Sequence, residues 1–215
     1  MSSVFTDGLP LADAFAEAWR AGACEFVGDD GGRIPLPLDR WTQSADESDR
    51  EVLGHCLGAT LDVGCGPGRM SQHLMDRGHR VLGIDIAWEA VSQARARGVF
   101  ALQRDVFSPL PAEGRWETVL LADGNLGIGG DPLALLARSA QLLAPGGRVV
   151  VDLAEPGHGV RIEWISLSSV SGLSQPFPWA VVGADSLAPL AHEVGFSVAA
   201  QHELPGRWFA VLERA

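Results

Sequence analysis

Between Thr60 and Leu153 the sequence alternates short apolar runs with stretches of helical pattern. The apolar runs, which are expected to be strands, are 60–63, 81–86, 99–102, 118–122 and 148–153. The expected helices are 68–77, 88–97 and 132–143. Strands separated by single helices form a parallel sheet with helices on both of its faces. The alternation therefore predicts an α/β, Rossmann-like fold.

The segments on either side of this core follow a different pattern. Residues 1–57 predict a helix over 11–20, a hairpin from 24–27 and 33–36, and a helix over 46–57. An insertion of about 155–182 predicts an antiparallel strand over 159–169 and a loop over 172–178. A helix over 184–194 follows. A closing hairpin of 197–203 and 207–213 completes a seven-stranded, mostly parallel sheet.

The segment Leu61–Arg69 is the most informative short stretch. Its glycines follow a strand and open a helix, and glycine lets the backbone turn tightly and approach a ligand closely. Asp85 ends the next strand, where its carboxylate can accept both hydroxyls of a ribose. The spacing is GxGxG, whereas dinucleotide sites use GxGxxG, so a nicotinamide oxidoreductase is disfavoured. The alternative is that these glycines have only a structural role and form a turn without binding a ligand.

Four segments resemble the motifs of class I S-adenosylmethionine-dependent methyltransferases, in the family's order. They are 61–68, 81–86, 104–107 and 142–148, and the hairpin at 197–213 is similar to the family's last two strands. The resemblance covers about residues 58–153, whereas 1–57 and 155–182 carry no family-wide motif. The resemblance implies a methyltransferase domain over 58–215, and we expect the N-terminal segment 1–57 to form a lid.

The resemblance also implies a cofactor, S-adenosylmethionine, and the residues that bind it. These are Asp62, Gly64, Cys65, Gly66, Gly68, Asp85, Ile86, Asp105, Val106, Ala122 and Asp123. Asp62 would reach the amino group of the methionine part, Asp85 the ribose and Asp105 the adenine. A turn or cap role for Asp105 stays open.

The sequence offers two candidates for catalysis, each following a predicted strand. Asp123 opens the glycine-rich run 123–131, whose glycines are expected to leave room for a ligand, and His158 follows the fifth strand. Asp123 is alternatively a helix cap, and His158 an exposed loop residue. We expect no metal. The rival reading is a magnesium site at Asp123 and Asp152, for which further oxygen ligands are not apparent.

Asn125, Phe177 and Trp179 are the candidate substrate residues. The two aromatic rings stand on a proline-stiffened segment and are expected to form an apolar wall, unless they only pack the insertion on the core. Arg40 is expected to pair with the cofactor carboxylate.

The charge and composition of the chain limit the classes of molecule that it is expected to bind. The formal net charge is −11 and no dense basic cluster is present, which disfavours nucleic acid and anionic membranes. Residues 1–7 do not resemble a signal peptide, so we expect a cytoplasmic protein. No CxxC pair occurs, which disfavours a thiolate zinc site. We expect a monomer or homodimer.

We therefore expect methyl transfer to an oxygen or nitrogen of a small molecule, by in-line displacement in a closed pocket. The alternatives are a protein methyltransferase and a protein that binds S-adenosylmethionine or S-adenosylhomocysteine without methylating.

Overall fold

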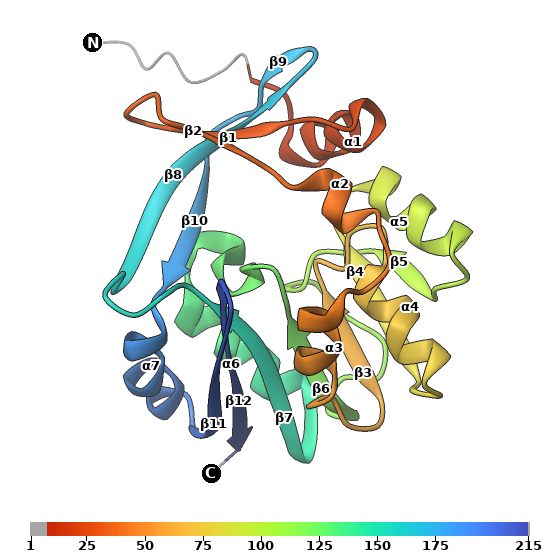
Figure 1. The fold of residues 1–215 in the computed structure, drawn as a ribbon, viewed down its shortest axis with the longest axis vertical. Coiled ribbons are helices and arrows are strands. Elements are labelled where there is room, and N and C mark those ends of the chain that lie inside the picture. The colour runs from red at the N-terminus through yellow and green to blue at the C-terminus, as the bar shows by residue number, and fades with distance from the viewer. Residues whose placement is uncertain (1–7, 215) are drawn as a thin grey trace.

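The computed structural model describes residues 8–214 (Figure 1). Residues 1–7, on which the expectation of no signal peptide depends, lie outside the described part. None of the described helices is long and apolar enough to cross a membrane.

The main sheet has seven strands in the order β11-β12-β7-β6-β3-β4-β5. The strands are β3 (Thr60–Val63), β4 (Val81–Asp85), β5 (Ala101–Gln103), β6 (Trp116–Leu121), β7 (Leu143–Leu153), β11 (Phe196–Leu204) and β12 (Arg207–Arg214). The strands from β3 to β7 pair in parallel, and β12 runs antiparallel to both β7 and β11. The predicted α/β fold with a C-terminal antiparallel hairpin is confirmed.

Helices cover both faces of this sheet (Figure 1). The helices are α3 (Glu47–Leu53), α4 (Arg69–Asp76), α5 (Trp88–Ala96), α6 (Pro132–Leu142) and α7 (Leu187–Glu193). Alternation along β6 explains the layers, because successive side chains of a strand point to opposite faces. Val119 and Leu121 belong to the buried cluster that contains residues of α6 and α7. Leu120 belongs to the cluster that contains residues of α3 and α4.

A second, antiparallel sheet combines the N-terminal segment with the insertion. Its order is β10-β8-β1-β2, with β9 paired to β8. The strands are β1 (Glu25–Gly28), β2 (Arg33–Pro35), β8 (Val160–Ser169), β9 (Gly172–Leu173) and β10 (Phe177–Val182). The predicted hairpin at 24–36 is confirmed. The loop predicted over 172–178 is wrong at both of its ends, since 172–173 and 177–178 pair with β8, and only 174–176 lie between strands.

The second sheet and α1 (Leu11–Ala21) pack together, and we refer to them jointly as the lid. Phe26 of β1 pairs in register with Leu167 of β8. Leu167 belongs to a buried cluster with residues of α1, and the partly buried Phe26 packs against that cluster. Figure 1 shows the lid at the upper end of the main sheet. Two short elements connect it to the core: α2 (Leu38–Trp41) leads from β2 toward α3, and the 3₁₀ segment η1 (Asn125–Gly130) packs on β10. Another 3₁₀ turn, η2 (Ala184–Ser186), precedes α7.

Candidate active site

A cavity of about 620 Å³ lies between the main sheet and the lid. One wall comes from the loops after β3, β4, β5 and β6, and the other from α1, α2 and the second sheet. Its volume falls within the range of small-molecule sites, about 300–1,000 Å³. The position agrees with the rule that ligands of open α/β sheets bind beyond the carboxyl ends of the strands.

Two carboxylates form the polar floor of this cavity. Asp62 of β3 is buried and accepts a hydrogen bond of 2.6 Å from the Ser71 hydroxyl. Burial raises the pKa of Asp62 to about 7, against the opposing effect of Ser71. At the end of β4, Asp85 accepts hydrogen bonds from the backbone N–H groups of Gly66 (3.0 Å) and Ala87 (2.8 Å). Burial raises the pKa of Asp85 as well, although these bonds oppose it.

Asn125 contacts the glycine loop directly. Its side-chain amide donates to the carbonyl oxygens of Val63 (2.8 Å) and Gly64 (3.1 Å). Gly64 has a φ of +68°, and a Cβ there would lie 2.6 Å from the Asn125 amide nitrogen. Any residue other than glycine would therefore both strain the backbone and push Asn125 away. Asn125 lines the cavity, but its amide group is occupied in holding the loop.

The predicted cofactor residues converge on this floor, except for Gly68. Those that line the cavity are Asp62, Gly64, Cys65, Gly66, Asp85, Ile86, Asp105, Val106, Ala122 and Asp123. Asp105 is exposed and accepts a hydrogen bond of 2.9 Å from the Phe107 N–H, so it also has the turn role considered above. Gly68 instead begins α4, where a Cβ would lie 3.0 Å from Ala94 of α5.

Aromatic side chains make up the lid half of the cavity. Phe177 and Trp179 of β10 line it together with Phe26 of β1. The ring centroids of Phe26 and Trp179 are 5.8 Å apart, and those of Phe26 and Phe177 are 6.1 Å apart. From the other side, Trp19 packs on Trp41 with centroids 5.9 Å apart. The structure thus brings Phe177 and Trp179 to the cavity, among aromatic residues of the N-terminal segment.

Two glycines of the run 123–131 allow close packing against β10 and do not enlarge the ligand cavity. A Cβ on Gly127 would lie 2.2 Å from the backbone oxygen of Ala180, and one on Gly130 would lie 2.4 Å from Pro178. Both positions allow η1 to lie against β10. The expectation that these glycines leave room for a ligand is wrong for these two positions.

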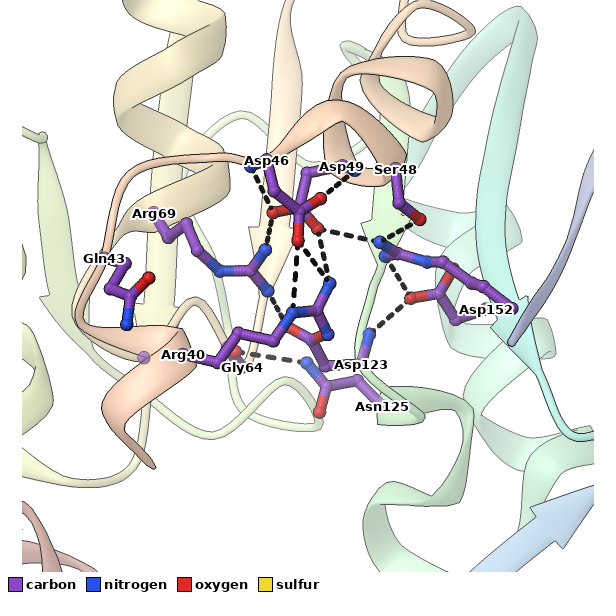
Figure 2. Close-up of polar contacts among 12 residues, drawn as sticks. Arg40, Gln43, Asp46, Ser48, Asp49, Gly64, Arg69, Asp123, Asn125 and Asp152 are labelled. Carbon is purple, nitrogen blue, oxygen red and sulfur yellow. Dashed lines mark hydrogen bonds and ion pairs between the residues drawn. The ribbon is translucent and has the colours of Figure 1, made fainter. Parts of the chain in front are cut away.

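A network of arginines and aspartates borders the cavity (Figure 2). At its centre is the fully buried Asp49 of α3. Its carboxylate accepts hydrogen bonds from Arg69 at the start of α4, from Arg40 of α2 (3.1 Å) and from Arg207 of β12 (2.7 Å). One side chain therefore connects the N-terminal segment to the glycine loop and to the C-terminal hairpin.

Sequence reasoning missed this network. The Asp46–Asp49 capping box of α3 and an arginine on the buried face of α4 were its only local signals.

Asp123 lies where this network meets the cavity. Its backbone adopts a φ of +53°, and its carboxylate pairs with Arg69 (2.5 Å) and Arg40 (3.6 Å). Its N–H donates to Asp152 (2.7 Å), which is itself paired with Arg207 (2.5 Å). Burial raises the pKa of Asp152, against the effect of Arg207. The oxygens of both aspartates are thus occupied by partners within the chain.

His158 is not brought to this site. It is exposed in the loop between β7 and β8, and it lines neither the cavity described above nor the polar cavity of about 410 Å³ beside Asp123. The chain leaves the end of β7 toward the second sheet and carries His158 away from the glycine loop.

Known proteins resemble this chain in sequence. Residues 60–147 match the model of a methyltransferase domain family. A trans-aconitate 2-methyltransferase of Paracidovorax citrulli is 32% identical over 128 residues, which are 56% of this chain and 49% of that protein. A ubiquinone biosynthesis O-methyltransferase of Leptothrix cholodnii is 29% identical over 133 residues, 58% of this chain and 49% of that protein. The matched stretch thus spans about half the length of each of these relatives.

Solved structures share the fold. A methyltransferase from Bacteroides fragilis, in complex with S-adenosyl-L-homocysteine, has a TM-score of 0.79 at 22% identity, covering 99% of this chain and 100% of that one. The 1,6-didemethyltoxoflavin-N1-methyltransferase of Burkholderia thailandensis has a TM-score of 0.66 at 20% identity, covering 95% and 87%. This chain therefore has the fold of these methyltransferases, and its residues 60–147 match the methyltransferase domain family.

Proposed function

We propose that this chain transfers the methyl group of S-adenosylmethionine to an oxygen or nitrogen atom of a small molecule held in the 620 Å³ cavity. One observation carries the proposal: a single cavity joins the glycine loop and its carboxylates to an aromatic wall from the lid. A cofactor and an acceptor molecule can therefore meet there, away from bulk water.

The residues of the floor suit this cofactor on their own chemistry. Asp85 would hold the ribose hydroxyls, because each of its carboxylate oxygens accepts one backbone bond and has capacity for another. Asp62, whose pKa burial raises to about 7, would pair with the ammonium group. Asp105 would meet the adenine beside the apolar Ile86 and Val106. When bound, the cofactor supplies an activated methyl group on a sulfonium.

The chain's own part is to bind, orient and exclude water. Phe177 and Trp179 would contact the acceptor, and Asn125 would keep the glycine loop in place. Asp123 lies at the border of the cavity and is our candidate catalytic residue, with the role of orienting the acceptor, since both of its carboxylate oxygens are paired with arginines. Arg40, beside Asp123, would face the cofactor carboxylate. The lid favours a small molecule over the tail of a protein. Cytoplasmic placement and the oligomeric state stay expectations.

Methyl transfer is tested with S-adenosylmethionine carrying a radioactive methyl group. The protein is incubated with a protein-free metabolite extract and, separately, with the protein fraction of the same cells. We expect the label in small molecules. Label in proteins would support a protein methyltransferase instead. No label in either fraction, with S-adenosylhomocysteine still bound by the protein, would support a non-methylating binding protein.

A further inference from the structure

We propose that the atom methylated is an uncharged nitrogen on a flat, aromatic molecule. This inference rests on the proposed function and narrows it, since it chooses nitrogen over oxygen. It is carried by two features of the cavity: the kinds of side chain that are missing from its wall, and the aromatic faces that are present.

The wall holds few groups that can take a proton. Within the part of the chain that the structure describes, its lining contains no histidine, glutamate, lysine or hydroxyl side chain. Its carboxylates are Asp62, Asp85, Asp105 and Asp123. The first three belong to the cofactor floor, and both oxygens of Asp123 are paired with arginines. An alcohol acceptor needs a base to remove its proton during attack, whereas an amine or ring nitrogen attacks with a lone pair that is already free.

The charged residues of the cavity wall also favour an uncharged acceptor. Arg40 is the only charged residue that α1, α2 and the second sheet contribute to the cavity, and it is held by Asp46, Asp49 and Asp123. An anionic acceptor would therefore find no unpaired cation on the lid side of the cavity, and burying an unpaired charge is costly. The remaining arginines of the lining belong to the opposite side, where Arg69 is paired with Asp49 and Asp123 and the exposed Arg104 lies next to Asp105 of the cofactor floor. An uncharged acceptor avoids this cost.

Aromatic faces favour the charge that such a reaction creates. The nitrogen lone pair forms the new N–CH₃ bond, the S–CH₃ bond breaks, and its electron pair remains on sulfur as the neutral thioether of S-adenosylhomocysteine. One positive charge thereby moves from sulfur to nitrogen, and any N–H proton leaves for water afterwards. Trp179, Trp41 and Trp19 line the cavity, and the face of a tryptophan attracts a cation more strongly than any other side-chain ring.

The proposal is tested by binding, so that the natural acceptor need not be known. Protein saturated with S-adenosylhomocysteine is titrated with 1-methylquinolinium, which mimics the cationic product, with its uncharged isostere 1-methylnaphthalene, and with the anion 1-naphthoate. A desolvated cation–π contact strengthens binding by about tenfold or more. We therefore expect 1-methylquinolinium to bind about tenfold more tightly than 1-methylnaphthalene. We expect 1-naphthoate to bind most weakly.

A matched pair of variants locates the effect. Trp179→Leu should reduce the preference for the cation to below about threefold, because it removes one aromatic face. Trp164→Leu is the control, since Trp164 lies on β8 of the same sheet but is 53% exposed and does not line the cavity. If Trp179→Leu no longer binds S-adenosylhomocysteine, Trp41→Leu takes its place.

Three outcomes would overturn the nitrogen assignment: 1-naphthoate binding most tightly, 1-methylquinolinium binding no better than 1-methylnaphthalene, or none of the three binding. Each can occur while S-adenosylhomocysteine still binds and methyl transfer is still measured, so failure here is distinct from failure of the proposed function.

Discussion

Replacing Asp49 by asparagine tests whether the buried network holds the N-terminal segment on the core. The change removes the charge that three guanidinium groups share, and the side chains of Arg69 and Arg207 are only 3% and 9% exposed. Breaking a buried ion pair by removing one partner costs about 3–5 kcal/mol. Because Arg69 keeps Asp123 and Arg207 keeps Asp152, we expect the lower end, about 3 kcal/mol.

The assay is urea unfolding followed by tryptophan fluorescence, with the free energy of unfolding obtained by linear extrapolation. For a chain of this length, about 3 kcal/mol corresponds to a fall in Tm of roughly 6–12 °C. Asp46→Asn is the matched control. Asparagine caps a helix as well as aspartate does, and the Arg40–Asp46 pair is exposed, so the control should lose less than about 1 kcal/mol. A loss for Asp49→Asn no larger than that of the control would refute the buried-network reasoning.

Three further predictions concern the cofactor floor, the start of α4 and the exposed histidine. Because the pKa of Asp62 is raised to about 7 and a bound ammonium group favours the ionised carboxylate, affinity for S-adenosylhomocysteine should fall by up to about tenfold per pH unit below pH 7. Calorimetry from pH 5.5 to 8 should show this slope in the wild type and not in Asp62→Asn. In the protein without ligand, the same raised pKa means that the stability contributed by Asp62 is greatest below about pH 4 and is lost as pH rises toward 7. Gly68→Ala should be more destabilising than Gly98→Ala in urea unfolding, because both glycines have positive φ (+85° and +86°) but only Gly68 has neighbours within 4 Å of a Cβ; equal losses would argue against the packing role. His158→Ala should leave kcat and KM within about twofold, since exposed substitutions rarely perturb a distant site; a large fall in kcat would restore His158 as a catalytic residue.

The main sheet could be predicted from sequence because its signals are local. Each strand from β3 to β7 contains a short apolar run, and each intervening helix has its own periodicity or stop. Asp62 and Asp85 could be placed for the same reason, since the carboxyl ends of neighbouring parallel strands lie together whatever the rest of the chain does.

The lid and the ion network depend on pairings between distant residues. Phe26 and Leu167 lie in paired strands of one sheet although about 140 residues separate them in the chain, and nothing near either residue specifies the other. Asp49 reads locally as a helix-cap residue, whereas its three arginine partners come from α2, α4 and β12. His158 was misplaced for a related reason: its position after a strand suggested the site, but the chain there turns toward the second sheet.

Titration of the protein with S-adenosylhomocysteine and with NAD, by isothermal calorimetry, tests the central claim most directly. We expect one S-adenosylhomocysteine molecule to bind per chain, NAD to give no heat of binding, and Asp85→Asn to weaken S-adenosylhomocysteine binding by about tenfold or more, because it weakens hydrogen bonds to a charged acceptor. Wild-type protein that binds NAD, or that fails to bind S-adenosylhomocysteine, would contradict the assignment of this cavity to the methyl-donor cofactor.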